Sequence, residues 1–316
     1  MESALLEKFP AAQVPRVLFF GMQGNFSSPS LIALLESGVD VDAVIVPASP
    51  LPGIKPLPIR RLEPPTRRPI LPLVHTPSSI LHIAWERQIP VWEVSSLKHT
   101  QTLSVLLAYR PDFLCVACFS LLIPSSVLSL PRSGCLNVHP ALLPVNRGPV
   151  PLFWTFREGD EYTGVTIHLM EEKMDSGAIL AQERFVVPEG IRYEQLEAEC
   201  ARHGGLLLAR TTWEFFQGDA QPIPQDETKS SYHSFPTEVD LVVVPQEWSA
   251  RHLYNFICGV ATWNGPIELH IADKHILVHD AVSYALDELD QRVKGSVVSG
   301  ELIVACKDGY VRVLLN

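Results

Sequence analysis

The sequence predicts an α/β domain built on a parallel-rich sheet, followed by a smaller all-β domain. Two apolar runs, Arg16–Gly21 and Val41–Val46, flank leucines at helical spacing, which is the pattern of a β-α-β unit. Beyond residue 218, short strand-like runs alternate with turn residues at the spacing of a small barrel. With 316 residues, 47% of them hydrophobic, the chain can bury a core in each part.

Composition and charge narrow the class of protein. The formal net charge of −10 gives no global attraction for nucleic acid or an anionic membrane. We find no signal peptide and no apolar run of the ~18 residues that a membrane span needs. Cys115 and Cys118 form a C-x-x-C pair inside an apolar run, so we expect buried thiols rather than a zinc site. These features favour a reduced, cytoplasmic monomer without membrane association.

The amino-terminal part is expected to alternate strands and helices. After the first strand, Ser28 or Ser30 can begin a helix that Gly38 stops. The turn before it, GMQGNF, lacks the G-x-G-x-x-G fingerprint, so a nicotinamide enzyme loses support. Further along, the pattern predicts helices at 78–88 and 100–108 and strands at 89–94 and 112–119.

A proline-dense stretch, residues 47–77, is predicted to be a loop without strand or helix. Against the single acid Glu63 it carries five cations, namely Lys55, Arg60, Arg61, Arg67 and Arg68. A solvated insertion is the ordinary interpretation, because a charge run usually forms a solvated face.

The stretch Cys135–Gly177 carries the candidate chemistry. A strand ending at His139 would point Asn137 and His139 to one face, because side chains alternate along a strand. A second strand, 164–170, leads into a loop that contains Asp175. If the two strands are neighbours, these side chains can supply an oxyanion donor, a proton shuttle and its orienting carboxylate. The alternative is a satisfied polar cluster at a strand end.

The carboxy-terminal part begins after a long amphipathic helix. A strand at 179–187 and this helix at 193–216 complete the first domain, which we place at residues 1–217. Turn-rich residues 218–232 are expected to be a linker, with the second domain at 233–316. That domain should contain a helix at 248–259 and strands at 267–271, 275–280, 295–298, 302–306 and 311–314.

Three motifs resemble the formyltransferases that use 10-formyltetrahydrofolate. They are N-x-H at Asn137, LLP-x-x-RG from Leu142, and G-x-T-x-H from Gly164 with D-x-G at Asp175. The interval from His139 to Asp175 suits the methionyl-tRNA and sugar branches of that family, and the segment ending in ACKDG resembles the carboxy-terminal domain of the methionyl-tRNA branch. The resemblance implies a Rossmann-like catalytic domain followed by an OB-like β-barrel.

The resemblance also implies roles for individual residues. Catalysis would fall to Asn137, His139 and Asp175. The folate co-substrate would contact Leu121, Leu122, Ile123, Ala141, Leu142, Leu143, Pro144, Glu171, Glu172, Lys173 and Met174. The acceptor would contact Phe26, Arg60, Arg61, Arg67, Arg68 and Arg147, the arginines at 60–68 belonging to a basic loop that meets the tRNA acceptor stem. For Arg147, together with Gly148, the alternative is that it holds the turn. The reaction implied needs no metal.

In the reaction implied, a primary amine attacks the formyl carbon. The amide of Asn137 would donate to the tetrahedral oxyanion. His139 would either take the amine proton or, as imidazolium, stabilise the oxyanion and pass a proton to N10 of the folate. Asp175 would fix the histidine tautomer and favour its protonated form.

The sequence defines the identity of the amine acceptor less closely than it defines formyl transfer. The methionyl amino group of initiator tRNA fits a two-domain chain best, but Ala141 replaces the serine of the family motif, and the linker motif lacks its lysine at 231–236. From Ser230 onward, six Lys or Arg face eleven Asp or Glu, whereas a tRNA-binding barrel should carry a basic face. A sugar-nucleotide amine, water in a hydrolase, and folate binding without catalysis are the alternatives.

Overall fold

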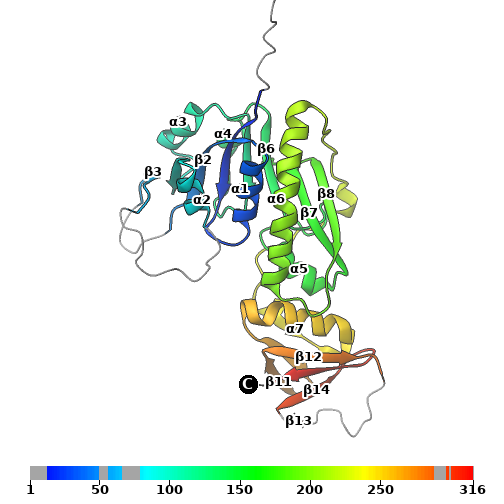
Figure 1. The fold of residues 1–316 in the computed structure, drawn as a ribbon. Coiled ribbons are helices and arrows are strands. Elements are labelled where there is room, and N and C mark those ends of the chain that lie inside the picture. Colours follow the sequence, from blue (N-terminus) through cyan, green and yellow to red (C-terminus); the bar gives the residue numbers. More distant parts are fainter. Residues whose placement is uncertain (1–12, 50–55, 66–78, 288–296, 299, 316) are drawn as a thin grey trace, which may run out of the picture.

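The computed structural model describes residues 13–49, 56–65, 79–287, 297–298 and 300–315. An eight-stranded sheet forms the larger part of the molecule, and a smaller β-rich part lies at one end of it (Figure 1). The strand order of the large sheet is β3-β4-β2-β1-β5-β6-β7-β8. The predicted α/β architecture with a mostly parallel sheet is therefore confirmed.

The centre of the large sheet is parallel and buried on both faces. Its five parallel strands are β1 (Arg16–Gly21), β2 (Asp40–Pro47), β4 (Val91–Val94), β5 (Phe113–Ala117) and β6 (Gly134–His139). Phe19, Phe20 and Phe113 are fully buried, which explains the continuous apolar runs in the sequence. Three antiparallel strands complete the sheet, namely β3 (Ile59–Leu62), β7 (Tyr162–Leu169) and β8 (Ile179–Val186).

Helices cover both faces of this sheet. One face packs against α1 (Ser27–Glu36), α2 (Ile80–Glu86) and α6 (Tyr193–Gln217), and the other against α3 (Thr100–Ala108) and α4 (Ser125–Leu128). The long helix α6 approaches its neighbours closely at two glycines. A Cβ on Gly204 would lie 2.5 Å from a methyl of Val138, and one on Gly205 would lie 2.7 Å from the Pro29 carbonyl oxygen.

The prediction of a structureless loop over residues 47–77 is wrong in part. Strand β2 extends to Pro47, and β3 (Ile59–Leu62) pairs antiparallel with β4, with Arg60 opposite Glu93. The prolines flank these four residues without interrupting them, and an edge strand tolerates proline at its ends. Lys55, Arg67 and Arg68 lie outside the described residues.

The smaller part combines one helix with two sheets. Helix α7 (Ala250–Asn264) continues five residues past its predicted end and packs against α6 and against α5 (Pro151–Glu158), which the sequence analysis missed. One sheet comprises β9 (Val242–Val243), β10 (Ile267–Ile271) and β11 (Lys274–Val278). The other comprises β12 (Asp280–Ala285), β13 (Val297–Val298), β14 (Glu301–Ala305) and β15 (Tyr310–Leu314). Short 3-10 turns occur at Glu227–Lys229, Glu238–Leu241 and Pro245–Glu247.

Specific contacts fix the two parts against each other. Arg192, at the start of α6, donates to both carboxylate oxygens of Asp280 at 2.7 and 2.9 Å. The ring of Tyr193 stacks on that of Trp263 with centroids 4.1 Å apart. Within the described residues, the carboxy-terminal ladders form two sheets and do not close into one barrel. Among all the residues that the structure describes, no helix is both long enough and apolar enough to cross a membrane.

Candidate active site

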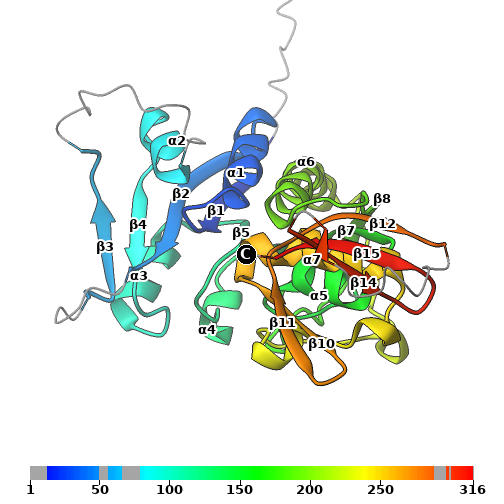
Figure 2. The same ribbon diagram turned by 90° about the horizontal axis from the view of Figure 1, so that it is seen from below.

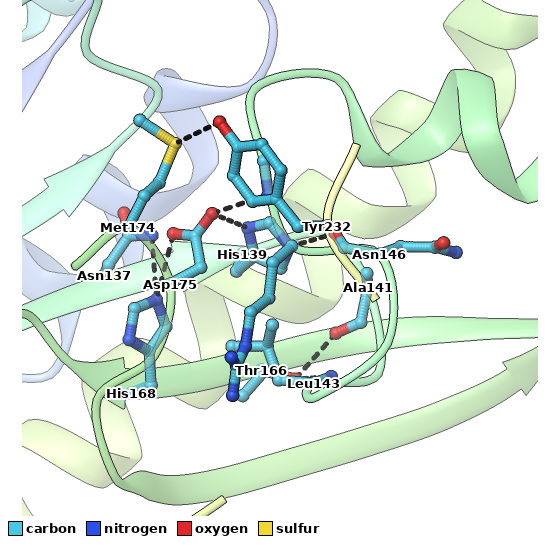
Figure 3. Close-up of polar contacts among 12 residues, drawn as sticks. Asn137, His139, Ala141, Leu143, Asn146, Thr166, His168, Met174, Asp175 and Tyr232 are labelled. Carbon is cyan, nitrogen blue, oxygen red and sulfur yellow. Dashed lines mark hydrogen bonds and ion pairs between the residues drawn. The ribbon is translucent and has the colours of Figure 1, made fainter. Parts of the chain in front are cut away.

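Strands β6 and β7 bring the three predicted catalytic side chains together. The strands pair antiparallel, with Asn137 opposite His168 and His139 opposite Thr166. The loop after β7 returns Asp175 to the end of β6, where its Oδ2 lies 3.8 Å from His139 Nδ1 (Figure 3). The expectation that the two strands are neighbours is confirmed.

Asp175 is held by both its backbone and its side chain. Its φ of +54° lies in the left-handed region, which aspartate tolerates better than most residues. The Oδ2 atom accepts the backbone N–H of Gly148 at 2.9 Å, and Oδ1 lies 3.6 Å from His168 Nε2. The carboxylate therefore sits between two imidazoles in a largely buried position.

His168 is a site residue that the sequence analysis did not assign. Burial lowers its pKa to about 4, so the ring is neutral at pH 7. Its Nδ1–H donates to the Leu169 carbonyl at 2.8 Å, which leaves Nε2 to accept an amide hydrogen of Asn137 at 3.1 Å. The second amide hydrogen of Asn137 has no partner among the described residues. The sequence signal for His168 was its place in the G-x-T-x-H motif, because the pairing of β6 and β7 sets this histidine directly opposite Asn137.

The tautomer of His139 follows from its own hydrogen bond. Nε2 lies 2.9 Å from the carbonyl oxygen of Asn146, which can only accept, so Nε2 carries the hydrogen. In the neutral ring the lone pair is then on Nδ1, facing Asp175. A proton that arrives at Nδ1 is stabilised by the carboxylate. The ring is 4% exposed, so this orientation is rigid.

Thr166 fixes the chain that follows His139. Its hydroxyl donates to the Ala141 carbonyl at 2.6 Å and accepts the Leu143 N–H at 3.2 Å. The side chains of Ala141 and Leu143 are buried, and the Leu143 carbonyl also accepts the side-chain amide of Gln182 at 2.7 Å, so the backbone groups of both residues are bonded within the protein. Leu142 contributes to a cavity of about 340 Å³ that Asn146 and Asp160 also line.

The other predicted folate segments converge on the same region. The Ser125 hydroxyl at the start of α4 donates to Glu172, which joins the loop after β7 to the turn after β5. In that turn Leu121 is half-buried, Leu122 is exposed and Ile123 is buried. Glu171, Glu172, Lys173 and Met174 are all exposed. Leu122 and Met174 are thus exposed apolar side chains on the two segments that the contact between Ser125 and Glu172 joins.

Residues 225–233, predicted to be mostly linker, form a strap across the active-site loops. Ser231 accepts the Arg147 N–H on its carbonyl at 3.0 Å and the Asn146 N–H on its hydroxyl at 2.8 Å. Gln225 donates to the carbonyls of Asp175 and Gly177 at 2.8 and 2.7 Å. The Tyr232 hydroxyl lies 4.0 Å from the sulfur of Met174 (Figure 3). The strap therefore bonds both to the turn after His139 and to the loop that carries Asp175.

Two predicted acceptor contacts fall on buried side chains. Arg147 is 3% exposed, and its guanidinium donates to Gln225 and Glu227 at 2.7 to 3.1 Å, so it holds the strap instead of facing an acceptor. Phe26 is 6% exposed and packs in the hydrophobic core. Arg60 and Arg61 are exposed but paired with Glu93 and Glu63.

Known proteins share both the sequence pattern and the fold. The formyl transferase family matches residues 16–212. The methionyl-tRNA formyltransferase of Bacillus licheniformis is 30% identical over 299 residues, covering 94% of this chain and 85% of its own. That of Synechocystis is 35% identical, covering 78% and 69%. The N-formyltransferase of Helicobacter canadensis superposes with a TM-score of 0.64 at 14% identity, covering 96% and 99%.

Stability should depend on the protonation of His168. Its pKa is about 4 in the folded chain and near 6.5 when unfolded, so the unfolded state binds more protons between these values. Folding stability therefore falls as the pH drops from 6.5 towards 4, by up to about 3 kcal/mol from this group. We expect His168→Gln to flatten that slope in urea unfolding at pH 4.5, 5.5 and 7. His82→Gln, an exposed control, should not; equal slopes for both variants would contradict the assignment.

The close contact between the strap and Gly148 should show in the unfolding free energy of a Gly148 variant. A Cβ on Gly148 (φ +120°) would lie 1.9 Å from the His233 carbonyl oxygen, whereas one on Gly265 (φ +103°) would meet no atom within 4 Å. Both alanine variants suffer backbone strain of ~1–3 kcal/mol, but only Gly148→Ala must also displace the strap. We expect Gly148→Ala to lose more unfolding free energy and to speed amide exchange at His233. Equal losses would mean that the strap does not press on Gly148.

Proposed function

The chain belongs to the formyl transferase family, and from this premise we propose that it formylates the methionyl amino group of initiator methionyl-tRNA. The formyl donor in this proposal is 10-formyltetrahydrofolate. The observation that carries the chemistry is the placement of Asn137, His139 and Asp175 at one strand end. Relatives named methionyl-tRNA formyltransferases, matching up to 94% of the chain, support the acceptor.

The geometry suggests how each catalytic group acts. The amide hydrogen of Asn137 that has no partner among the described residues would donate to the oxyanion that forms when the amine attacks the formyl carbon. Nδ1 of His139 would take a proton from the attacking nitrogen, with Asp175 stabilising the imidazolium. The same proton then passes to N10 as the bond between N10 and the formyl carbon breaks. A new C–N bond replaces the old one, so atoms and protons balance.

We propose that folate binds beside these groups, between the turn at 121–124 and the loop at 171–174. The apolar side chains of Leu122 and Met174 would contact the pterin ring, and the backbone of residues 141–144 would bound the pocket. The solved Helicobacter canadensis enzyme of the same fold is described as a complex with folinic acid, which supports a folate as the co-substrate.

The carboxy-terminal part bears on which amine acceptor the enzyme uses. The chain passes from β11 into β12 with only His279 between them, so we propose that the two sheets approximate an OB-like barrel after a boundary at residues 218–232. Its acid excess disfavours a polyanionic acceptor such as tRNA, and a second candidate acceptor is an amino-sugar nucleotide, which carries far fewer phosphates. The Helicobacter canadensis enzyme is described with dTDP-3-aminofucose.

The proposal is tested by a turnover screen. Purified protein with 10-formyltetrahydrofolate is offered methionyl-tRNA, dTDP-amino sugars and water alone in parallel. We expect formylated product only with methionyl-tRNA. Product with an amino sugar would transfer the proposal to the second candidate, and formate release without an amine would indicate a hydrolase.

The catalytic residues should affect turnover far more than folate binding. Asn137→Ala removes an oxyanion donor and should lower kcat by ~10²–10³, and His139→Ala should lower it comparably, because both act on the transition state. Folate affinity, measured by fluorescence titration, should stay within a few-fold. Asn264→Ala and His82→Ala remove the same side-chain types at exposed positions and serve as controls. Near-normal kcat in either site variant would remove that residue from the mechanism.

The basic segment within residues 47–77 should account for part of the tRNA affinity. Neutralising Arg60, Arg61, Arg67 and Arg68 to Gln removes up to four phosphate partners, and each lost contact flattens the slope of log affinity against log salt by ~0.9 on duplex RNA. We therefore expect a flatter slope in filter-binding titrations with methionyl-tRNA. The matched control neutralises four exposed cations elsewhere, namely Lys98, Arg110, Arg202 and Arg210. An unchanged slope would mean that the segment is only solvated surface.

A further inference from the structure

The hairpin of β10 and β11 gathers two histidines and a glutamate on one face. His270 and His275 face each other directly across the two strands, with ring centroids 4.0 Å apart. Glu268 precedes His270 by two residues on the same strand, so its side chain points to the same face. The hairpin belongs to the smaller part of the molecule, on a different sheet from the catalytic groups (Figure 2).

The three side chains converge on one point. Oε1 of Glu268 lies 2.7 Å from His270 Nε2 and 2.7 Å from His275 Nδ1. All three potential ligand atoms lie within 4.8 Å of one another. Around a tetrahedral zinc ion with bonds of about 2.0–2.1 Å, ligand atoms stand roughly 3.3–3.5 Å apart. A small rotation of each side chain gives that spacing, and exposed fractions of 33% to 64% leave room for it.

The donor set selects the kind of ion. Two imidazoles and one carboxylate form the three-ligand set of open zinc sites, which leave a fourth position for water or another ligand. Magnesium and calcium prefer oxygen ligands alone, so they fit poorly. In the absence of an ion, two N–H groups donate to the same carboxylate oxygen. A divalent cation would bind the same two nitrogens once each neutral ring carries its hydrogen on the other nitrogen, and the acid excess beyond Ser230 favours its binding.

We propose that Glu268, His270 and His275 form a binding site for one divalent cation of the zinc class, which ties β10 to β11. The site stands apart from the formyl-transfer residues and contributes no group to that reaction. Its effect would be on the stability of the hairpin, because a ligand that binds only the folded state raises the unfolding temperature. The proposal is independent of the identity of the acceptor.

The test is calorimetric titration of the full chain with zinc chloride in a non-chelating buffer, together with a thermal melt. We expect one saturable ion per chain and a higher Tm with zinc. His275→Ala and Glu268→Gln should each weaken binding by at least about tenfold, since even supporting residues around metal ligands are worth that much. His82→Ala removes an exposed imidazole elsewhere and should bind zinc like the wild type.

A second readout separates a built site from scattered weak binding. Cobalt(II) in a four-coordinate site with two imidazoles absorbs strongly in the visible range, whereas hydrated cobalt does not. We expect this absorption in the wild type and in His82→Ala, and its loss in His275→Ala. Absence of saturable zinc binding, or equal binding by His275→Ala and the wild type, would show that the cluster forms histidine–carboxylate hydrogen bonds only.

Discussion

The register between β6 and β7 is the constraint on which the active site depends. It places His168 opposite Asn137 and Thr166 opposite His139, so one strand pairing sets both the amide and the imidazole. A shift of either strand by one residue would turn its two side chains to the other face of the sheet and separate them from their partners. The buried, neutral His168 then orients the Asn137 amide, and Thr166 holds the chain after His139. The pairing of two strands therefore sets the positions of Asn137 and His139.

Charge in the site is arranged around a single carboxylate. Asp175 accepts a backbone N–H from Gly148 and faces His139 on one side and His168 on the other. The two imidazoles have different roles because their second nitrogens have different partners. His168 is committed to Asn137 and stays neutral, whereas His139 presents a lone pair towards Asp175. In the proposed mechanism, the carboxylate can therefore stabilise a proton on His139 while burial keeps His168 neutral.

Local sequence pattern was sufficient to predict most of the fold and the grouping of the three candidate catalytic side chains. Long apolar runs and helical spacing predicted β1, β5 and α6, and alternation predicted that Asn137 and His139 share a face. What the sequence could not supply were contacts between distant segments. Arg147 was assigned to the acceptor because its bonds to Gln225 and Glu227 span about eighty positions, and β3 was hidden by flanking prolines. The His168 pKa likewise depends on burial, which no local pattern reports.

The strap is synthesised after the loops that it holds. Gln225 and Ser231 belong to a segment that follows the whole large sheet in the chain, yet they secure the loops around His139 and Asp175. During synthesis, the sheet can form before this segment has left the ribosome. The hydrogen bonds from Gln225, Ser231 and His233 to these loops can form only after residues up to His233 have emerged. For the same reason, cutting the chain after α6 would remove part of the active site.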